Sequence, residues 1–573
     1  MSETELNDSS RMEGDRFWAE THAVENVPPP LVDRNLFTSD RALCEAIARE
    51  GAGWAERDLA AFGALAGSSR MIELGFAANE SRPRLHTHDR HGRRIDEIRY
   101  HPAYHELMRV AIDGGLHSSH WTDPGPGAQV ARAAKFYLQT QVEAGHGCPI
   151  TMTSAALPAL RHQPDLFEIW APRIQARHYD PRNVPAEEKA GLTVGMAMTE
   201  KQGGSDVRAN STLAHPVAAR GPGALHELVG HKYFVSAPMS DLFLVLAQAP
   251  GGLSCFLLPR WRPDGTKNPL QIQRLKDKMG NVSNASSETE LRGAWAWMIG
   301  EEGRGVRTII DMVAMTRFDC MVGSSAGMRQ AVAQVAHHCG HRVAFGKRLS
   351  EQPLMQNVLA DLAVEQEAAL LLSMRIAGAL DRRNDEGEDA LVRIGTAVGK
   401  YWICKRTPGH TYEAMECIGG SGVMEECIMP RLFRESPINA IWEGSGNVQC
   451  LDVLRAMRRE PFTVEAFRAE VGRAKGSDER LDRFVDGLER ELRDPENLEY
   501  RARRVVEKMA LALEGSLLVR FGAPAVAEAF CASRLGESGR GWLYGDLPPG
   551  VDCRAIIDRA MPSGDAAGGG AEP

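Results

Sequence analysis

The chain has 573 residues, of which 43% are hydrophobic and 25% charged, and its formal net charge at pH 7 is -9. This length exceeds one ordinary core and predicts three or four structural units. The negative charge argues against nonspecific nucleic-acid binding by the molecule as a whole, although a local basic patch can still attract a polyanion.

The N-terminal segment and the cysteines indicate a cytoplasmic protein. Residues 1–36 read as an acidic, flexible leader without a signal peptide, and no apolar run reaches the roughly 18 residues of a membrane span. The 11 cysteines are scattered without a C-x-x-C pair, which favours reduced thiols and gives no support to a metal site.

Residues 37–195 are expected to form a mostly helical N-terminal domain. Ser39 or Asp40 would cap its first helix. Few strand signals separate the helical patterns that follow. These patterns cover 103–112, 129–144 and 164–176.

The pattern changes over residues 196–303 to short alternating or apolar runs divided by glycine, proline and asparagine, which predicts an antiparallel sheet or barrel. Residues 304–450 return to helical periodicity, with one apolar stripe over 306–313, another over 328–335 and the small residues "GSSAG" (323–327) between them. Four long helices with short connections predict a bundle. Residues 451–558 form a further helical segment, and 559–573 read as a disordered tail. The predicted fold class is multidomain α+β.

Three segments carry candidate binding chemistry. "MAMTEKQGGSDV" (196–207) sets hydroxyls beside a glycine pair, whose backbone N–H groups can turn toward an anion. "HRVAFGKRLSEQ" (341–352) joins an arginine fork for phosphate to a phenylalanine that can stack on a flat ring. "ECIGGSGV" (416–423) is a glycine-rich turn that lets backbone approach a ligand. Taken singly, each also fits an ordinary loop or a turn between helices.

The stretch "IWEGSGNVQC" (441–450) places one carboxylate, Glu443, between a tryptophan and a glycine-serine-glycine run. This carboxylate could be a catalytic base, part of a cofactor cradle, or an ordinary acid at a turn. The pattern alone leaves these three interpretations open.

Taken together and in this order along the chain, these segments resemble the acyl-CoA dehydrogenase family of flavoproteins, and "GHKYFVS" (230–236) is a further family element. "EAGHGCPITMT", "LKDKMGNVSNAS" and "MTRFDC" extend the likeness to its alkylation-response subfamily over almost the whole chain. The resemblance implies a helical N-terminal domain, a central antiparallel β-domain and a four-helix bundle. It also implies an extra C-terminal helical domain after about residue 450.

The resemblance implies FAD between the β-domain and the bundle. The β-domain residues expected to line the flavin are Met196, Met198, Thr199, Gly204, Ser205, Phe234, Val235 and Ser236. The residues expected to reach the FAD of a neighbouring subunit are Arg342, Phe345, Gln352, Gly419 and Gly420. The residues expected to hold the cofactor beside Glu443 are Ile441, Trp442, Ser445, Gly446 and Asn447. A site shared between subunits implies a homo-oligomer, a tetramer of paired dimers.

Glu443 matches the family's catalytic base, which removes the α-proton of an acyl thioester while the flavin accepts a hydride. Shielding by Trp442 would raise the pKa of the carboxylate and make it a better base near neutral pH. Some relatives carry the base on a bundle helix before an arginine. This chain has Thr316 there, so Glu443 alone fits the family pattern. Val423 replaces a common aromatic residue, which indicates an altered substrate pocket.

The subfamily is linked to protection of DNA against alkylating agents and has weak isovaleryl-CoA dehydrogenase activity. The resemblance therefore implies double-stranded DNA as a partner, and an acyl-CoA or another small molecule as substrate. A metabolic short- or branched-chain acyl-CoA dehydrogenase is the rival function, and a structural oligomer that retains FAD without turnover is a third.

The candidate DNA surface is the C-terminal segment. Its candidate contact residues are Arg455, Arg458, Arg459, Arg501, Arg504 and Lys508. Residues 501, 504 and 508 are spaced to share a helix face and could meet phosphates. Residues 451–573 hold 19 basic and 22 acidic side chains. On charge alone, therefore, a solvated helix face paired with the acids of 489–500 is the favoured alternative.

Overall fold

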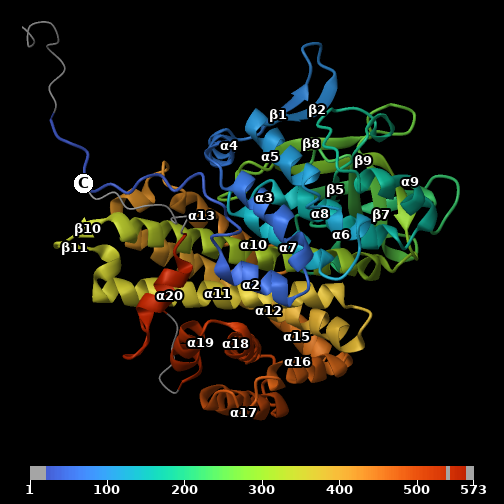
Figure 1. The fold of residues 1–573 in the computed structure, drawn as a ribbon. Coiled ribbons are helices and arrows are strands. Elements are labelled where there is room, and N and C mark those ends of the chain that lie inside the picture. The colour runs from blue at the N-terminus through green and yellow to red at the C-terminus, as the bar shows by residue number, and fades with distance from the viewer. Residues whose placement is uncertain (1–20, 537–542, 563–573) are drawn as a thin grey trace, which may run out of the picture.

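The computed structural model describes residues 21–536 and 543–562, and it has the multidomain α+β fold that the sequence predicts. Helices, a sheet, a bundle and further helices follow one another along the chain (Figure 1). In the described part of the chain, none of the helices has the length and apolarity needed to cross a membrane. The leader up to residue 20 and the tail from residue 563 lie outside the described residues.

The N-terminal domain is helical, as expected, and the side chain of Asp40 caps its first helix by accepting a hydrogen bond from Leu43 N. Its helices are α2 (Arg41–Arg49), α3 (Glu56–Ala66), α4 (Ser69–Glu80), α5 (Pro102–Asp113), α6 (Ser119–Thr122), α7 (Ala128–Thr140), α8 (Gly147–Leu160) and α9 (Pro164–Ile174). The expectation of few strands missed an antiparallel hairpin formed by β1 (Arg84–His88) and β2 (Arg94–Arg99).

The β-domain is a seven-stranded sheet in the order β3-β5-β4-β6-β7-β9-β8. Its strands are β3 (Val194–Ala197), β4 (Leu213–Pro216), β5 (Leu225–Ser236), β6 (Leu242–Ala249), β7 (Gly252–Pro259), β8 (Leu270–Leu275) and β9 (Ser286–Ile299). The expected antiparallel arrangement needs one correction, because β3 and β4 both pair with β6 in parallel. The added β5–β9 pairing brings distant strands of this order together.

The bundle contains three long helices, α10 (Gly305–His341), α11 (Pro353–Asp381) and α12 (Glu386–Ile418). Four were expected, because two apolar stripes were assigned to separate helices that form the single 37-residue α10. The shorter α15 (Gly446–Arg459) packs against α12 and crosses the predicted boundary at residue 450. Short α13 (Met429–Glu435) and α14 (Ile438–Ile441) lie between them in the chain.

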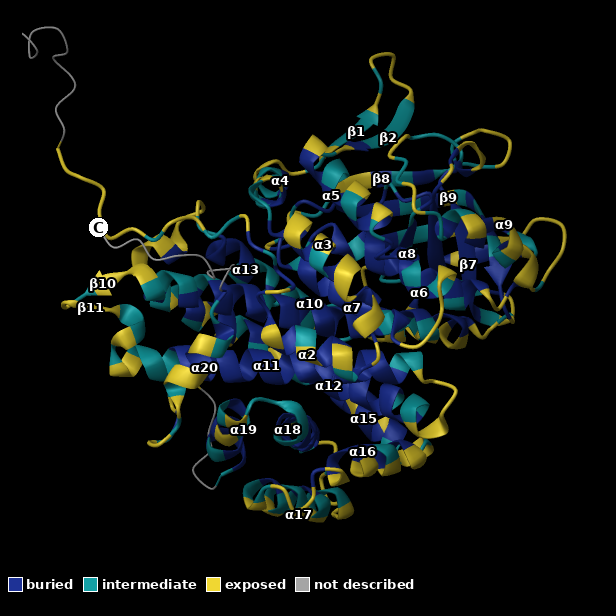
Figure 2. Cartoon of the chain, viewed as in Figure 1, coloured by how far each residue is buried: buried dark blue, intermediate teal, exposed yellow. Residues whose placement is uncertain are grey.

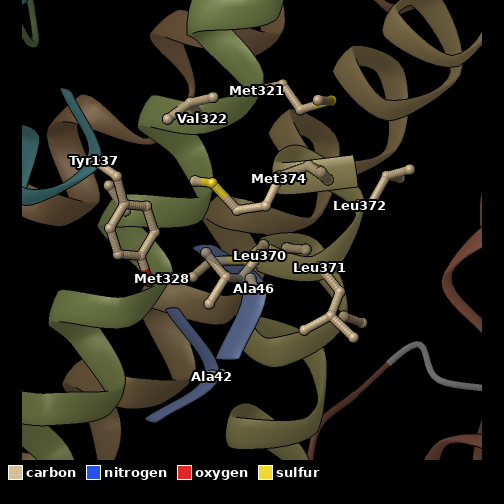
Figure 3. Packing of buried hydrophobic residues seen from close by; sticks show 14 of the residues in the cluster. Ala42, Ala46, Tyr137, Met321, Val322, Met328, Leu370, Leu371, Leu372 and Met374 are labelled. Atoms are coloured by element: carbon tan, nitrogen blue, oxygen red, sulfur yellow. The ribbon is translucent and has the colours of Figure 1, made fainter. Parts of the chain in front are cut away.

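Helices of the N-terminal domain pack into the same hydrophobic core as the bundle. Met321 of α10 and Met374 of α11 are fully buried in the same cluster as Ala46 of α2 and Tyr137 of α7 (Figure 3). Tyr137 donates a hydrogen bond to Asp40 at 3.1 Å, so its hydroxyl is satisfied inside the core. The helices of two predicted domains therefore share one hydrophobic core.

The C-terminal helices cover one side of the bundle (Figure 1). They are α16 (Phe462–Gly472), α17 (Glu479–Arg493), α18 (Ala502–Phe521), α19 (Pro524–Phe530) and α20 (Cys553–Ala560). Buried polar contacts fix them to α11: Arg375 pairs with Glu470 at 2.8 Å, and Arg534 pairs with Asp361. Most exposed residues of this layer lie on its outer side, including α17 (Figure 2).

Part of the expected flexible leader lies along the bundle. The side-chain amide of Asn26 donates to Val343 O at 2.8 Å and its oxygen accepts from Val343 N at 2.7 Å. Arg34 donates to Gln330 on α10 at 2.9 Å. These contacts hold the segment before α2 against the bundle.

Candidate active site

A cavity opens where the N-terminal domain, the β-domain and the bundle meet. Helix α8 contributes Cys148 and Thr151 to its wall, and α10 contributes Thr316. Met196, Ser236, Trp442 and Glu443 also line it. Residues from three predicted domains and from separate sequence motifs thus reach one site.

Two strands form the β-domain wall. Met196 on β3 pairs with Ser236 at the end of β5, so both residues reach the cavity together. Val235 is fully buried in the sheet, and the neighbouring Phe234 is 40% exposed. The period-two alternation of a strand turns these neighbours to opposite faces.

The loop after β3 carries the other flavin candidates of the first motif. Met198 and Thr199 are half-buried, whereas Gly204 and Ser205 are exposed. A Cβ at residue 204 would lie 2.6 Å from Thr199 Oγ1, so glycine permits this close approach. The loop offers backbone and hydroxyl groups at the edge of the β-domain.

A buried ion pair anchors this loop, and sequence reasoning missed it. Lys232 Nζ lies 2.8 Å from Glu200 Oε1, and both side chains are fully buried. Glu200 also accepts hydrogen bonds from the backbone N–H groups of Ser211 and Thr212. Both charged residues stand inside quoted motifs, "TEKQGG" and "GHKYF", which was the available signal.

Glu443 occupies a strained turn between α14 and α15. Its φ of 56° lies in the left-handed region, which is uncommon for a residue other than glycine. Arg317 Nε donates to Glu443 O at 2.9 Å, and Lys400 Nζ donates to Trp442 O at 2.9 Å. Gln449 also donates to Gly444 O at 3.0 Å. Three side chains thus fix the turn and leave the carboxylate on the cavity wall.

Among the described residues, the carboxylate of Glu443 has one direct partner, the hydroxyl of Thr316, which donates to Oε2 at 2.7 Å. Loss of solvent contact raises the pKa of Glu443, while the Thr316 hydrogen bond and the charges of Arg317 and Lys400 oppose this rise. A raised pKa suits a carboxylate that must accept a proton near neutral pH. Thr316, at the alternative base position of the family, is therefore a hydrogen-bond partner of the predicted base, Glu443.

A second carboxyl lines the same cavity. Burial away from solvent and the negative charge of Glu143 raise the pKa of Glu435 to about 7. The hydrogen bond that Asn281 N donates to Glu435 at 2.8 Å opposes this rise. Glu143 itself accepts from His146 Nδ1 at 2.7 Å, and Arg431 donates to Val142 O. These groups make one part of the cavity wall polar, and Glu143 and His146 stand inside the quoted motif "EAGHGCPITMT".

A groove lies beside the start of α15, on the far side of the Glu443 turn. The predicted residues Ile441, Ser445, Gly446 and Asn447 line it, together with Lys405 and Arg503. Arg503 of α18 donates from Nε to Asn447 Oδ1 at 2.8 Å, so the C-terminal domain reaches the predicted cofactor loop. Two exposed cations at this groove suit an anionic group.

The residues predicted to reach the FAD of a neighbouring subunit lie at the other end of the bundle. Thr316 and Arg342 are separated by about 26 residues of α10, or roughly 39 Å at ~1.5 Å per residue. Phe345 is 99% exposed at the turn between β10 (Val343–Ala344) and β11 (Lys347–Arg348), and Gln352 precedes α11. Within one chain this group does not join the cavity at Glu443.

The glycine turn belongs to the same distal end. Gly419 ends α12 with a φ of 75°, and Gly420 follows it, both exposed. Helices α10 and α12 run in the same direction, with α11 between them in the chain (Figure 1). Their C-terminal ends therefore place the glycine turn and the Arg342 hairpin on one side of the molecule.

The six candidate DNA contacts divide into two groups. Arg501 pairs with Asp494 at 3.2 Å, and Arg504 and Lys508 both pair with Glu491. These three cations have the local acidic partners that the alternative interpretation of the helix face requires. The second group is Arg455, Arg458 and Arg459, exposed on α15. Arg455 lies 3.7 Å from Asp452, whereas Arg458 and Arg459 form no ion pair with a residue that the structure describes.

Three family descriptions match successive parts of the chain. "Adaptive response protein AidB N-terminal domain" matches residues 26–181. "Acyl-CoA dehydrogenase, middle domain" matches 195–294, and "Acyl-CoA dehydrogenase, C-terminal domain" matches 303–458. The matched segments correspond to the N-terminal helices, the sheet and the bundle.

Whole-chain comparisons agree with these matches. AidB of Escherichia coli (strain K12) is 45% identical over 522 residues, covering 91% of this chain and 95% of that protein. Caenorhabditis elegans ACDH-11 in complex with C11-CoA has a TM-score of 0.82 at 26% identity, covering 95% and 97% of the two chains. A Bacillus anthracis acyl-CoA dehydrogenase complexed with FAD shares the fold at a TM-score of 0.62 and 18% identity, covering 80% and 86%.

Proposed function

This chain belongs to the acyl-CoA dehydrogenase family, and from that membership we propose that it is an AidB-like flavoprotein of the adaptive response to DNA alkylation. In this proposal it binds double-stranded DNA and protects it or destroys alkylating agents, with at most weak acyl-CoA dehydrogenase activity. Isovaleryl-CoA is the expected acyl substrate. The observation that carries the catalytic part is Glu443, held on the cavity wall by Thr316.

FAD is the cofactor of this family, and the residues of this chain fit it. Met196 and Ser236 form a β-domain wall opposite Glu443 for a flat ring. Lys405 and Arg503 flank the groove at Asn447, where a pyrophosphate would meet two cations. Bound FAD would supply the hydride acceptor at the wall of this cavity.

The chain's own residues would prepare the acyl substrate. Glu443 accepts the α-proton onto its carboxylate, and Thr316 keeps one carboxylate oxygen hydrogen-bonded before the transfer. The fixed turn around Trp442 limits movement of the base. The bound complex of ACDH-11 with C11-CoA supports an acyl-CoA as a substrate class for this fold.

The distal group supports a cofactor site shared between subunits. Arg342, Phe345 and the glycine turn lie far along the bundle from Glu443, and Phe345 is almost fully exposed. We therefore assign them to the FAD of a neighbouring subunit, in a homo-oligomer with a tetramer of paired dimers as its form.

All eleven cysteines are unpaired, which supports a cytoplasmic location.

The adaptive-response assignment draws on the match of residues 26–181 to the AidB N-terminal domain and on the likeness to E. coli AidB. The C-terminal candidates for DNA contact reduce to Arg458 and Arg459, because the other four have acidic partners among the described residues. Contacts of this kind would be sequence-independent and weakened by salt.

The intact base and its cavity also favour a second function, that of a metabolic short- or branched-chain acyl-CoA dehydrogenase. A salt-titrated duplex-binding assay, run beside turnover assays on a panel of acyl-CoA thioesters, separates the two. The first proposal predicts salt-dependent duplex binding and slow turnover. Fast turnover of one acyl-CoA without duplex binding would establish the second function instead.

A further inference from the structure

A basic hairpin projects from the upper end of the molecule, formed by β1 and β2 (Figure 1). Residues 82–94 contain five arginines and three histidines but a single acidic residue, Asp89. The hairpin lies on the opposite side of the molecule from α17 of the C-terminal domain (Figure 1). It is therefore a concentrated positive feature on a chain with a negative net charge.

The base of the hairpin is fixed to the β-domain. Ile98 packs with Ile272 of β8 in a small apolar cluster that Leu85 also contacts. Arg94 donates to Ile272 O at 2.7 Å and to Asp96 at 2.8 Å, and Arg82 pairs with Asp277. Two of the five arginines, Arg82 and Arg94, thus fasten the hairpin to the β-domain.

Three arginines of the hairpin have no acidic partners among the described residues: Arg84 at its base, opposite Arg99, and Arg90 and Arg93 in its turn. Asp89 accepts hydrogen bonds from the backbone N–H groups of His91 and Arg93, at 2.8 and 2.9 Å, and so closes the turn. Arg84, Arg90 and Arg93 are exposed, and none forms an ion pair with any residue that the structure describes. The hairpin therefore differs from the C-terminal helix face, where Arg501, Arg504 and Lys508 are paired.

We propose that this hairpin is a DNA-binding arm that contacts the phosphates of duplex DNA through Arg84, Arg90 and Arg93. The inference rests on the proposed DNA partner and places the contact on the N-terminal domain. A two-stranded ribbon is narrow enough to enter the major groove. Forked guanidinium groups suit phosphate oxygens.

The composition of the tip favours a polyanion over other partners. Residues 86–94 include no large apolar side chain, whereas protein interfaces and membrane surfaces are recognised largely through such groups. Contacts to phosphates alone position a duplex without reading its sequence. The arm is accordingly expected to bind duplexes of unrelated sequence with similar affinity.

The test compares two triple variants of the full-length holoprotein on a fluorescent duplex at several KCl concentrations. The first is R84Q/R90Q/R93Q. The second removes the same net charge from exposed arginines that are paired elsewhere, at Arg220, Arg468 and Arg554. Flavin content and circular dichroism establish that both variants are folded.

The hairpin variant should bind duplex about ten-fold or more weakly at low salt, and the slope of log K against log salt should fall by roughly 2–3, at about 0.9 per lost phosphate contact. The control variant should keep most of the native affinity for duplex and most of the native salt slope. Equal binding by the native chain and the hairpin variant, or equal loss in both variants, would overturn the arm alone. A native chain that binds no duplex would overturn the proposed function as well. Hairpin-dependent binding to phosphatidylserine vesicles without duplex binding would also reject the proposal.

Discussion

At the scale of single residues, the contact between Thr316 and Glu443 predicts the pH dependence of the reaction. The hydroxyl donates to the carboxylate and so lowers the pKa of Glu443. Thr316→Val removes that donor, and the pKa should rise by about one unit for each ~1.4 kcal/mol lost. Since the base must be deprotonated, the acidic limb of kcat/KM should move to higher pH.

A pH profile of kcat/KM measures this shift. Thr308→Val is the matched control, because Thr308 is a buried threonine on the same helix whose hydroxyl bonds Arg304 O. An acidic limb that stays in place in the Thr316 variant would show that the hydrogen bond does not set the pKa of the base.

The motifs predicted a candidate base, Glu443, but not the residues that surround it. Glu443 could be identified because its neighbours follow a family pattern. Thr316 entered only as a position without a carboxylate, since no pattern links residues 127 positions apart. The Glu200–Lys232 pair was also missed, because the sequence does not show whether two charged motif residues are buried together as an ion pair or face solvent separately.

At the scale of elements, Glu470 on α16 connects the C-terminal domain to the bundle. Burial tends to raise its pKa, but Arg375, Arg520 and Arg473 outweigh this and hold it at about 2. A depressed pKa gives a stabilisation that is complete above about pH 4.5 and is lost as the pH falls toward 2, about 3 kcal/mol in all. Acid should therefore loosen α16 and α18 from α11.

Hydrogen exchange of the α16 and α18 amides at pH 7 and pH 3 reports this docking. Glu470→Gln should already increase exchange at pH 7 and should show a smaller further increase on acidification. Glu489→Gln, which removes a surface pair with Arg468, should leave exchange of these helices unchanged. Equal acid sensitivity of native and E470Q protein would exclude Glu470 as the source.

Periodicity predicted most helices and strands, and the exceptions have physical causes. Two apolar stripes belong to one helix, because "GSSAG" at 323–327 is small but still helical when packed in a core. The β1–β2 hairpin escaped notice because its strands, RLHTH and RIDEIR, hold only Leu85, Ile95 and Ile98 as apolar residues and lack a strict apolar–polar alternation. Parallel pairing of β3 with β6 depends on chain path, which local pattern does not contain.

At the scale of the whole molecule, the distance between Glu443 and the Arg342 hairpin predicts complementation between subunits. Arg342→Glu should damage the partner's cofactor site, and Glu443→Gln should disable its own. In a one-to-one mixture, mixed dimers should have one complete site, so about a quarter of the native activity should return.

Refolding or co-expression of the two variants, followed by an acyl-CoA turnover assay, checks this expectation. A mixture of E443Q with E443A is the control and should stay inactive, because both changes lie at one position. Full activity of R342E by itself, or recovery in neither mixture, would contradict a site shared between subunits.

The most direct measurement is the anaerobic bleaching of the oxidised flavin by acyl-CoA thioesters, followed in native protein and in E443Q. The proposed site predicts yellow protein in both cases, with bleaching in the native chain that slows by about 10²-fold or more in the variant, the usual contribution of a positioned general base. Bleaching of E443Q at the native rate would contradict the assignment of Glu443 as the base that faces the flavin.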